Sequence, residues 1–112
     1  MHDEHKGRAI LAAAVESERV AVVAATLPAA QAICSELADL VESSSVGATV
    51  RRLNGAHSIE FPGGGRIVFL SFRSNFRGLS LDRIFVPIGT SAELVRELSL
   101  CLAVSGGPLV GY

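Results

Sequence analysis

The chain has 112 residues, of which 49% are hydrophobic and 19% are charged, a composition that excludes a disordered chain and predicts a single domain over residues 1–112. Its formal net charge of −1 excludes a protein held to polyanions by bulk charge alone. No apolar run reaches about 18 residues and no signal-peptide pattern follows the mixed-charge start, so we expect no membrane association and a cytoplasmic location.

The first half of the chain alternates between helix and strand patterns. Residues 7–18 carry alanines and an isoleucine at helical spacing, and residues 19–26 form a continuous apolar run of strand length. Such a run is typical of a strand covered on both faces in a parallel sheet. Thr26 can cap a second helix that tolerates Pro28 in its first turn and ends in the serines at 43–45.

The middle of the chain has the shorter period of β-strands. Short strands are predicted over 49–53 and 58–61, and a return strand over 66–72. The Asn-Gly pair at 54–55 and the Pro-Gly-Gly-Gly sequence at 62–65 indicate hairpin turns. A phosphate-binding loop would have to precede a helix, which these three glycines do not.

The last third returns to alternating elements. A polar loop over 73–80 leads into a strand over 82–87, which a proline ends. The spacing of Thr90 and Glu93 is that of a capping box, and it predicts a helix over 91–104. A final strand begins at residue 109. This order predicts an α/β fold, a three-layer sandwich around a mostly parallel sheet with a β-hairpin insertion.

Cysteine and histidine spacing gives no indication of a metal site. Cys34 and Cys101 occupy apolar helix positions, which predicts two reduced thiols in the core. His2 and His5 could bind a metal weakly, but the spacing places no third ligand beside them, and His57 is expected in a turn. We therefore expect neither a metal nor a cofactor.

Charge is distributed unevenly along the chain. Residues 1–42 carry three basic and seven acidic side chains, residues 43–83 carry six arginines against two acids, and residues 84–112 carry one arginine against two acids. The middle third is therefore the candidate anion-facing surface. Arginine suits bidentate contacts with anions, although coding bias would also explain its excess over lysine.

Four segments together resemble the ATPase domain of phage terminase large subunits, and more broadly the RecA-like fold of helicases. These segments are residues 5–14, 20–26, 59–69 and 77–86. The first resembles the end of a Walker A motif, the second the following strand, the third a terminase hairpin, and the fourth the approach to Walker B. The resemblance spans nearly the whole chain and implies a RecA-like domain.

The chain departs from Walker A at several positions. Lys6 stands where the phosphate-binding lysine of the motif would be, but His5 replaces the preceding glycine and Gly7 replaces the serine or threonine that holds magnesium. Only five residues precede Lys6, which leaves no room for a glycine-rich loop. We expect Lys6 to be vestigial.

The chain also departs from Walker B. Pro87 and Ile88 stand where the two carboxylates would follow the strand, and Asp82 lies at the other end of that strand. Phosphoryl transfer depends on these groups for magnesium and for the attacking water. We therefore expect no catalytic residues and no ATPase activity. An enzyme using Lys6 with a loop supplied by a partner is the less favoured alternative.

The resemblance also implies that a central strand is missing. The remaining strands must then close the gap, or two sheet edges stay open. An open apolar edge favours a homodimer or a protein partner bound through that edge, and the alternative is a monomer with a rearranged sheet.

Two functions follow from these expectations. The first is a non-catalytic protein-interaction or regulatory module, encoded by a phage or prophage, that uses Arg66, Arg73, Phe76 and Arg77 as contact residues. The second is a nucleic-acid-binding protein in which Arg51, Arg52, Arg66, Arg73 and Arg77 contact phosphates and Phe76 stacks on bases.

Overall fold

The computed structural model describes residues 1–53 and 56–112, so the Asn-Gly turn predicted at 54–55 lies outside the described residues. Its helices and strands follow the predicted order. They are α1 (Asp3–Ala14), β1 (Arg19–Ala24), α2 (Leu27–Ser43), β2 (Thr49–Leu53), β3 (Ala56–Glu60), β4 (Arg66–Ser71), β5 (Arg83–Val86), α3 (Ala92–Leu100) and β6 (Leu109–Gly111).

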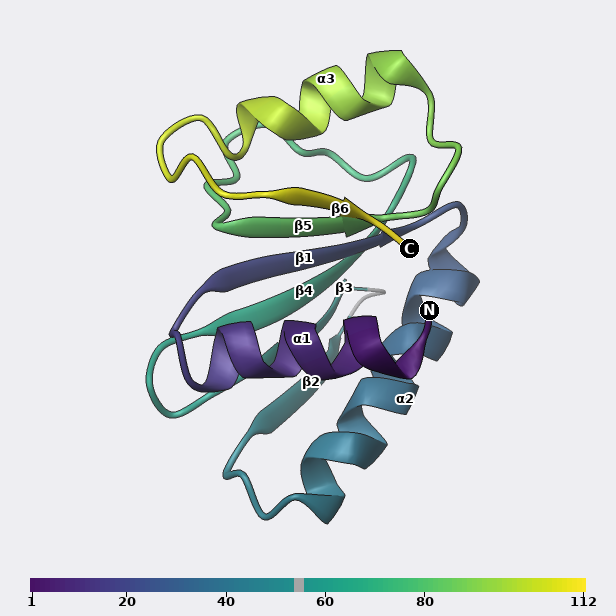
Figure 1. Cartoon of the computed structure of the whole chain (residues 1–112). Helices are drawn as coiled ribbons and strands as arrows, with labels where there is room; N and C mark the ends of the chain where they lie inside the picture. The colour runs from purple at the N-terminus through teal and green to yellow at the C-terminus, as the bar shows by residue number, and fades with distance from the viewer. Residues whose placement is uncertain (54–55) are drawn as a thin grey trace.

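The described strands form one mixed sheet in the order β2-β3-β4-β1-β5-β6 (Figure 1). β1 pairs in parallel with both β4 and β5, and β5 pairs in parallel with β6. β2, β3 and β4 pair in antiparallel fashion. The predicted α/β fold with a mostly parallel sheet and an inserted hairpin is therefore confirmed.

The two faces of the sheet are covered by different helices, which makes the three layers of the sandwich. Val20 and Val22 of β1 pack in one core with α1 and α2. Ala21 and Val23 pack in a second core with Leu98 of α3. Successive strand residues point to opposite faces, so the apolar run in β1 fills both cores at once.

The starts of α2 and α3 depend on side-chain caps, and one differs from its prediction. Thr26 Oγ1 accepts a hydrogen bond from the backbone N–H of Ala29 at 3.2 Å, as predicted. In α3 the cap is Ser91, whose Oγ accepts from Leu94 N–H, and not Thr90, which donates its hydroxyl to the Pro87 carbonyl instead. The Thr90 hydroxyl closes the preceding turn, so the cap moves one residue along the chain.

Two helix boundaries also differ from the prediction. α1 begins at Asp3, because the acidic residues Asp3 and Glu4 suit the positive end of a helix dipole. α3 ends at Leu100, and the segment from 101 to 105 continues as turns and not as helix. Leu102 of that segment is nevertheless buried in the core.

The glycine-rich segment at 62–65 is a hairpin turn, as predicted. Phe61 N–H donates to the Gly65 carbonyl at 2.9 Å, and Gly64 N–H donates to the Phe61 carbonyl at 3.0 Å. Gly64 has φ +93°, a conformation that favours glycine. A Cβ on Gly65 would lie 1.9 Å from the Ala13 carbonyl oxygen, so only glycine allows this turn to approach α1.

The expected gap in the sheet is not present among the described strands. β1 is hydrogen-bonded to neighbours on both sides, and the sheet runs without interruption from β2 to β6. Of the two alternatives, the remaining strands therefore close the gap, and the edges of the described sheet are β2 and β6.

Candidate functional site

The carboxyl ends of the parallel strands define the place where this architecture binds ligands. The chain leaves β1 for α2 on one face of the sheet and leaves β5 for α3 on the other face. In open α/β sheets, adjacent strands with this divergence form a crevice at their carboxyl ends. The candidate site is therefore the space beyond β1 and β5, on the side where Figure 1 shows the start of α1 and the end of β6.

The residues that follow β5 carry no carboxylate before α3 begins. Pro87 and Ile88 come first, and the Ile88 side chain is 79% exposed. Gly89 then turns the chain with φ +91°. The placement of Pro87 and Ile88 directly after the strand agrees with the prediction. The position after β5 therefore offers an exposed apolar side chain and no metal-binding oxygen from a side chain.

Tyr112 occupies part of the same crevice. Its hydroxyl donates a hydrogen bond to the carbonyl of Val23 near the end of β1, and its ring packs against the α1 and α2 core. Burial raises the pKa of the Tyr112 phenol, so the hydroxyl keeps its proton near neutral pH. Tyr112 therefore ties the β6 end to β1 across the carboxyl end of β5.

Lys6 lies in the first two turns of α1 and is held by acidic side chains. Its Nζ is 2.8 Å from Glu36 Oε2 on α2 and 3.6 Å from Asp3 Oδ1, and its side chain is 13% exposed. The hydrogen bond to Glu36 is the largest of the effects that raise the pKa of Lys6. Lys6 thus joins α1 to α2 in this structure.

His5 is the neighbour of Lys6 on the core side of α1. Its ring lies 6.1 Å from the ring of Phe85, centroid to centroid, at an interplanar angle of 60°. Its Nδ1 is buried and has no hydrogen-bond partner among the described residues. The imidazole ring therefore packs against Phe85 of β5.

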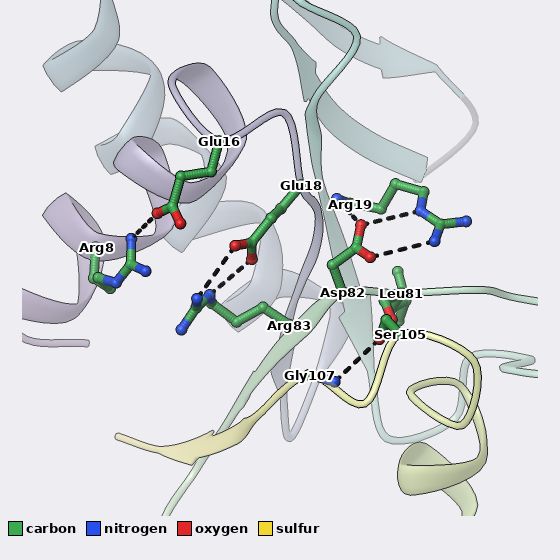
Figure 2. A network of polar contacts seen from close by, with 9 residues as sticks. All are labelled: Arg8, Glu16, Glu18, Arg19, Leu81, Asp82, Arg83, Ser105 and Gly107. Atoms are coloured by element: carbon green, nitrogen blue, oxygen red, sulfur yellow. Dashed lines mark hydrogen bonds and ion pairs between the residues drawn. The ribbon is translucent and has the colours of Figure 1, made fainter.

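Asp82 lies at the amino end of β5, at the other end of the strand from the candidate crevice. Figure 2 shows its carboxylate beside Arg19. Its carboxylate accepts hydrogen bonds from the backbone N–H of Arg19 at 2.7 Å and from the Arg19 guanidinium at 3.1 and 3.3 Å. These hydrogen bonds lower the pKa of Asp82. Asp82 therefore ties the start of β5 to the start of β1 and lies far from any ligand beyond the carboxyl ends.

A second ion pair strengthens the same end of the sheet. Arg83 donates to both oxygens of Glu18, at 2.9 and 3.3 Å, and both side chains are less than a fifth exposed. Figure 2 shows this pair between two others: the pair of Arg8 on α1 with Glu16 just after that helix, and the Asp82–Arg19 pair. Glu18, after α1, therefore pairs with an arginine at the amino end of β5, whereas Glu16 pairs with Arg8 of α1.

The structure separates the arginines that were predicted to share one surface. Arg66 begins β4, whereas Arg73 and Arg77 follow its other end. Arg51 on β2 pairs with Glu60 at 3.0 Å, and Arg52 on the same strand points toward the other face of the sheet. Because β4 separates Arg66 from Arg73 and Arg77, the five arginines do not form one continuous patch.

Phe76 differs from its predicted role. Its side chain is 8% exposed and packs in the α3 core with Leu81 and Leu98, so its ring is not available for stacking on a base. The Cys101 thiol donates to its carbonyl at 3.4 Å. One signal in the sequence could have shown this burial. The otherwise polar loop carries three large hydrophobic residues two or three positions apart, Phe76, Leu79 and Leu81.

Both cysteines are reduced and buried, as predicted. Burial raises the pKa of the Cys101 thiol. It also raises the pKa of the Cys34 thiol, although the nearby Arg52 guanidinium acts in the opposite direction. Among the residues that the structure describes, no group of three or more histidine, cysteine or acidic side chains could hold a metal ion.

Sequence reasoning missed a groove between the loop after β4 and helix α3. It has a volume of about 500 Å³, within the roughly 300–1,000 Å³ typical of ligand pockets. The loop wall includes Arg77 and Leu79, and the helix wall includes Glu97 and Leu100. A smaller cavity of about 340 Å³ lies near Arg73 at the end of β4. The two walls of the groove are some twenty residues apart in the sequence, so only the tertiary packing forms it.

The two open edges of the sheet differ in chemistry. β2 presents the charged side chains of Arg51 and Arg52, whereas β6 consists of Leu109, Val110 and Gly111. Charged side chains discourage pairing at an edge, and short apolar edges lack that protection. β6 is therefore the edge more open to pairing.

The fold is similar to part of a solved phage large terminase. The chain is similar to the large terminase of a thermophilic bacteriophage in complex with ADP (TM-score 0.61, 18% identity, 84% of this chain and 25% of that chain). It is also similar to a second crystal form of that terminase (TM-score 0.63, 16% identity, 84% and 25%) and to the complex with ATP-gamma-S (TM-score 0.61, 18% identity, 84% and 24%). The chain thus spans about a quarter of the terminase structures that it matches.

No protein-family model matches the chain, and no curated protein matches it. At 16–18% identity the likeness to the terminase structures shows the fold alone. No helix in the described part of the chain is long and apolar enough to cross a membrane.

Proposed function

We propose that this chain is a terminase-like domain without nucleotide chemistry of its own, acting as a protein-interaction or regulatory module. The observation that carries the proposal is the carboxyl end of β5, where Pro87 and Ile88 follow the strand, whereas Asp82, which precedes the strand, is tied to Arg19 at the opposite end. We further propose that it is phage- or prophage-encoded and works in the host cytosol.

The similar terminase structures make nucleotide binding the activity to compare with this chain. The phage terminase was solved with ADP and with ATP-gamma-S. Phosphoryl transfer in such folds needs a cation on the phosphates and a carboxylate for magnesium. In this chain Lys6 is engaged by Glu36 at 2.8 Å, and an exposed isoleucine follows β5. A phosphate would have to displace Glu36 to reach Lys6.

The first test is a measurement of Mg²⁺-dependent phosphate release from ATP. We expect the wild-type protein and Lys6→Ala to give the same background rate, with Arg8→Ala, the next cation on α1, as the matched control. Calorimetry with ADP should show no binding. Turnover in the wild type that is lost in Lys6→Ala and kept in Arg8→Ala would refute the proposal.

We propose the β6 edge as the interaction surface, paired with a strand of a second chain. Pro108 and Tyr112 face β5, since Ile84 N–H donates to the Pro108 carbonyl and Tyr112 N–H donates to the Val86 carbonyl. The backbone groups of Leu109 and Gly111 alternate with these and point away from the sheet. A strand beside β6 would satisfy them.

Amide exchange followed by NMR tests whether a second copy provides that strand. If a second copy provides it, the exchange of Leu109 and Gly111 slows as protein concentration rises; if a different protein does, the exchange slows only when that partner is added. The Tyr112 amide, already bonded to Val86 within the sheet, is the internal reference. Exchange at Leu109 and Gly111 that is fast and independent of concentration would contradict self-pairing at this edge.

A second candidate function is nucleic-acid binding through Arg73 and Arg77. It is favoured by their exposure and by the absence of any ion pair to either guanidinium among the described residues. Each phosphate contact contributes about one unit to the slope of log affinity against log salt. The double variant Arg73→Ala, Arg77→Ala should therefore flatten the slope by about two units, and Arg51→Ala, already paired with Glu60, should change it less. Binding that does not depend on salt would exclude this function.

A further inference from the structure

The groove beside α3 carries an inference that is independent of the nucleotide site and of the β6 edge. The segment 74–79 forms one wall, and Glu97, Leu100 and Cys101 form the other. The loop is held against the helix at the base of the groove, because Phe76 is 8% exposed and its carbonyl accepts a hydrogen bond from the Cys101 thiol at 3.4 Å. The loop and the helix therefore form a groove with a fixed base.

The two walls carry charges of opposite sign that the chain leaves unpaired. Arg77 is on the loop wall and Glu97 is on the helix wall, and both residues are exposed. Within residues 1–53 and 56–112, neither side chain makes an ion pair or hydrogen bond. Elsewhere in the described part of the chain some charged side chains are paired, as Arg83 is with Glu18, and others, such as Arg73, are not.

Exposed apolar side chains lie in the helix wall of the groove and in the turn segment that follows α3. Leu100 is 76% exposed and Val104, four residues further on, is 90% exposed, the highest fraction among the large hydrophobic residues described. Leu98 and Leu102 of the same segment are 0% and 6% exposed. Residues 98–104 thus carry apolar side chains on two sides. The side with Leu98 and Leu102 is buried in the core, and the side with Leu100 and Val104 is exposed.

We propose that this surface binds a second copy of the chain about a two-fold axis near Leu100. In a two-fold interface each contact occurs twice, so Arg77 of one copy meets Glu97 of the other and the reverse. Val104 of each copy enters the groove of the other. A surface with one free cation, one free anion, a groove and an apolar side chain beside it is complementary to itself.

The small extent of the surface is typical of weak complexes. A standard interface buries about 800 Å² per partner, roughly an eighth of the 6091 Å² accessible surface of the chain. The groove walls and the turn after α3 form only a short segment, so the interface lies at the weak end of that range. We therefore expect a reversible dimer with a dissociation constant on the order of 10 to 100 µM.

Sedimentation velocity across about 5 to 500 µM measures this equilibrium directly. The wild type should change from monomer to dimer over that range. Val104→Asp should weaken the dimer at least about tenfold, because it replaces an apolar side chain of the interface with a carboxylate that loses its water on binding. The matched control is Val15→Asp, at a valine that is 70% exposed at the end of α1 on the other face of the sheet. It should dimerise like the wild type.

A charge exchange supplies a test that does not depend on the apolar contact. Arg77→Glu and Glu97→Arg should each weaken the dimer, and the double variant should restore it, because the pairs re-form with reversed sign. Thermal unfolding of each variant confirms that the fold is retained.

Gly111→Pro separates this interface from pairing at the β6 edge, because it removes a backbone N–H that points away from the sheet. We expect it to leave the groove dimer intact. Three results would overturn the proposal. They are a monomer at every concentration, a dimer that Val104→Asp does not weaken, and a double variant that dimerises no more strongly than the two single variants. A dimer lost only in Gly111→Pro would assign association to the β6 edge instead.

Discussion

Replacing Gly65 with alanine should force the hairpin away from α1. The Cβ that this change adds would lie 1.9 Å from the Ala13 carbonyl oxygen, 2.8 Å from its carbon and 3.0 Å from the Ser17 Cα. Non-bonded carbon and oxygen atoms lie at about 3.3 Å or more, so about 1.4 Å of movement is needed. All three neighbours are backbone atoms, two in the last turn of α1 and one in the segment that follows it, and none can rotate away as a side chain would.

The loss of stability should be large for a single methyl group. Overpacking a rigid contact typically costs about 1–3 kcal/mol, and a backbone clash of this depth belongs at the upper end. With a urea m-value of about 1.5 kcal/mol/M, a loss of about 3 kcal/mol lowers the unfolding midpoint by about 2 M. Urea unfolding followed by circular dichroism measures that shift.

Two matched glycine variants separate the clash from other effects of the change. Gly64→Ala has open space around the new Cβ but φ +93°, so it should cost only about 1 kcal/mol. Gly7→Ala, inside α1 with nothing within 4 Å, should stabilise the protein by up to about 1 kcal/mol. Equal and small effects of all three changes would show that the turn does not contact α1 as described.

The remaining predictions concern Asp82 and the two cysteines. The pKa of Asp82 is lowered by its hydrogen bonds to Arg19, so its contribution to stability is present above the ordinary aspartate pKa of about 3.9 and is lost as the pH falls through the lower folded value. Asp82→Asn should therefore lower the free energy of unfolding at pH 7. It should also make that free energy fall less steeply as the pH is lowered through the acidic range, and an unchanged fall would contradict this. Both thiols are buried with raised pKa values, so a thiol reagent should react at the rate of unfolding, and instant reaction of the native protein would contradict the buried placement.

Most of the elements could be predicted from the sequence because their signals are local. The apolar run in β1 implied coverage on both faces, and Thr26 with Pro28 marked the start of α2. The glycines after Phe61 marked a hairpin turn and not a phosphate loop. Each of these patterns depends on neighbours within a few residues, for which period and turn chemistry are reliable guides.

The helix boundary at α3 shows where local patterns fail. The capping-box spacing pointed to Thr90, but the hydroxyl of that residue closes the turn after Pro87, and Ser91 caps the helix. Neighbouring hydroxyls compete for the same role, and the geometry of the incoming turn decides between them.

The sequence by itself determined the fold class, the absence of carboxylates directly after β5 and the burial of the cysteines, because each follows from the residue types within one segment. Only the tertiary structure decided which segments meet. It placed Asp82 on Arg19, buried Phe76, divided the arginines between the two ends of β4, and formed the groove from a loop and a helix some twenty residues apart. These outcomes depend on strand order and on the packing of distant segments, since contacts of this kind leave no periodic signal in a single sequence.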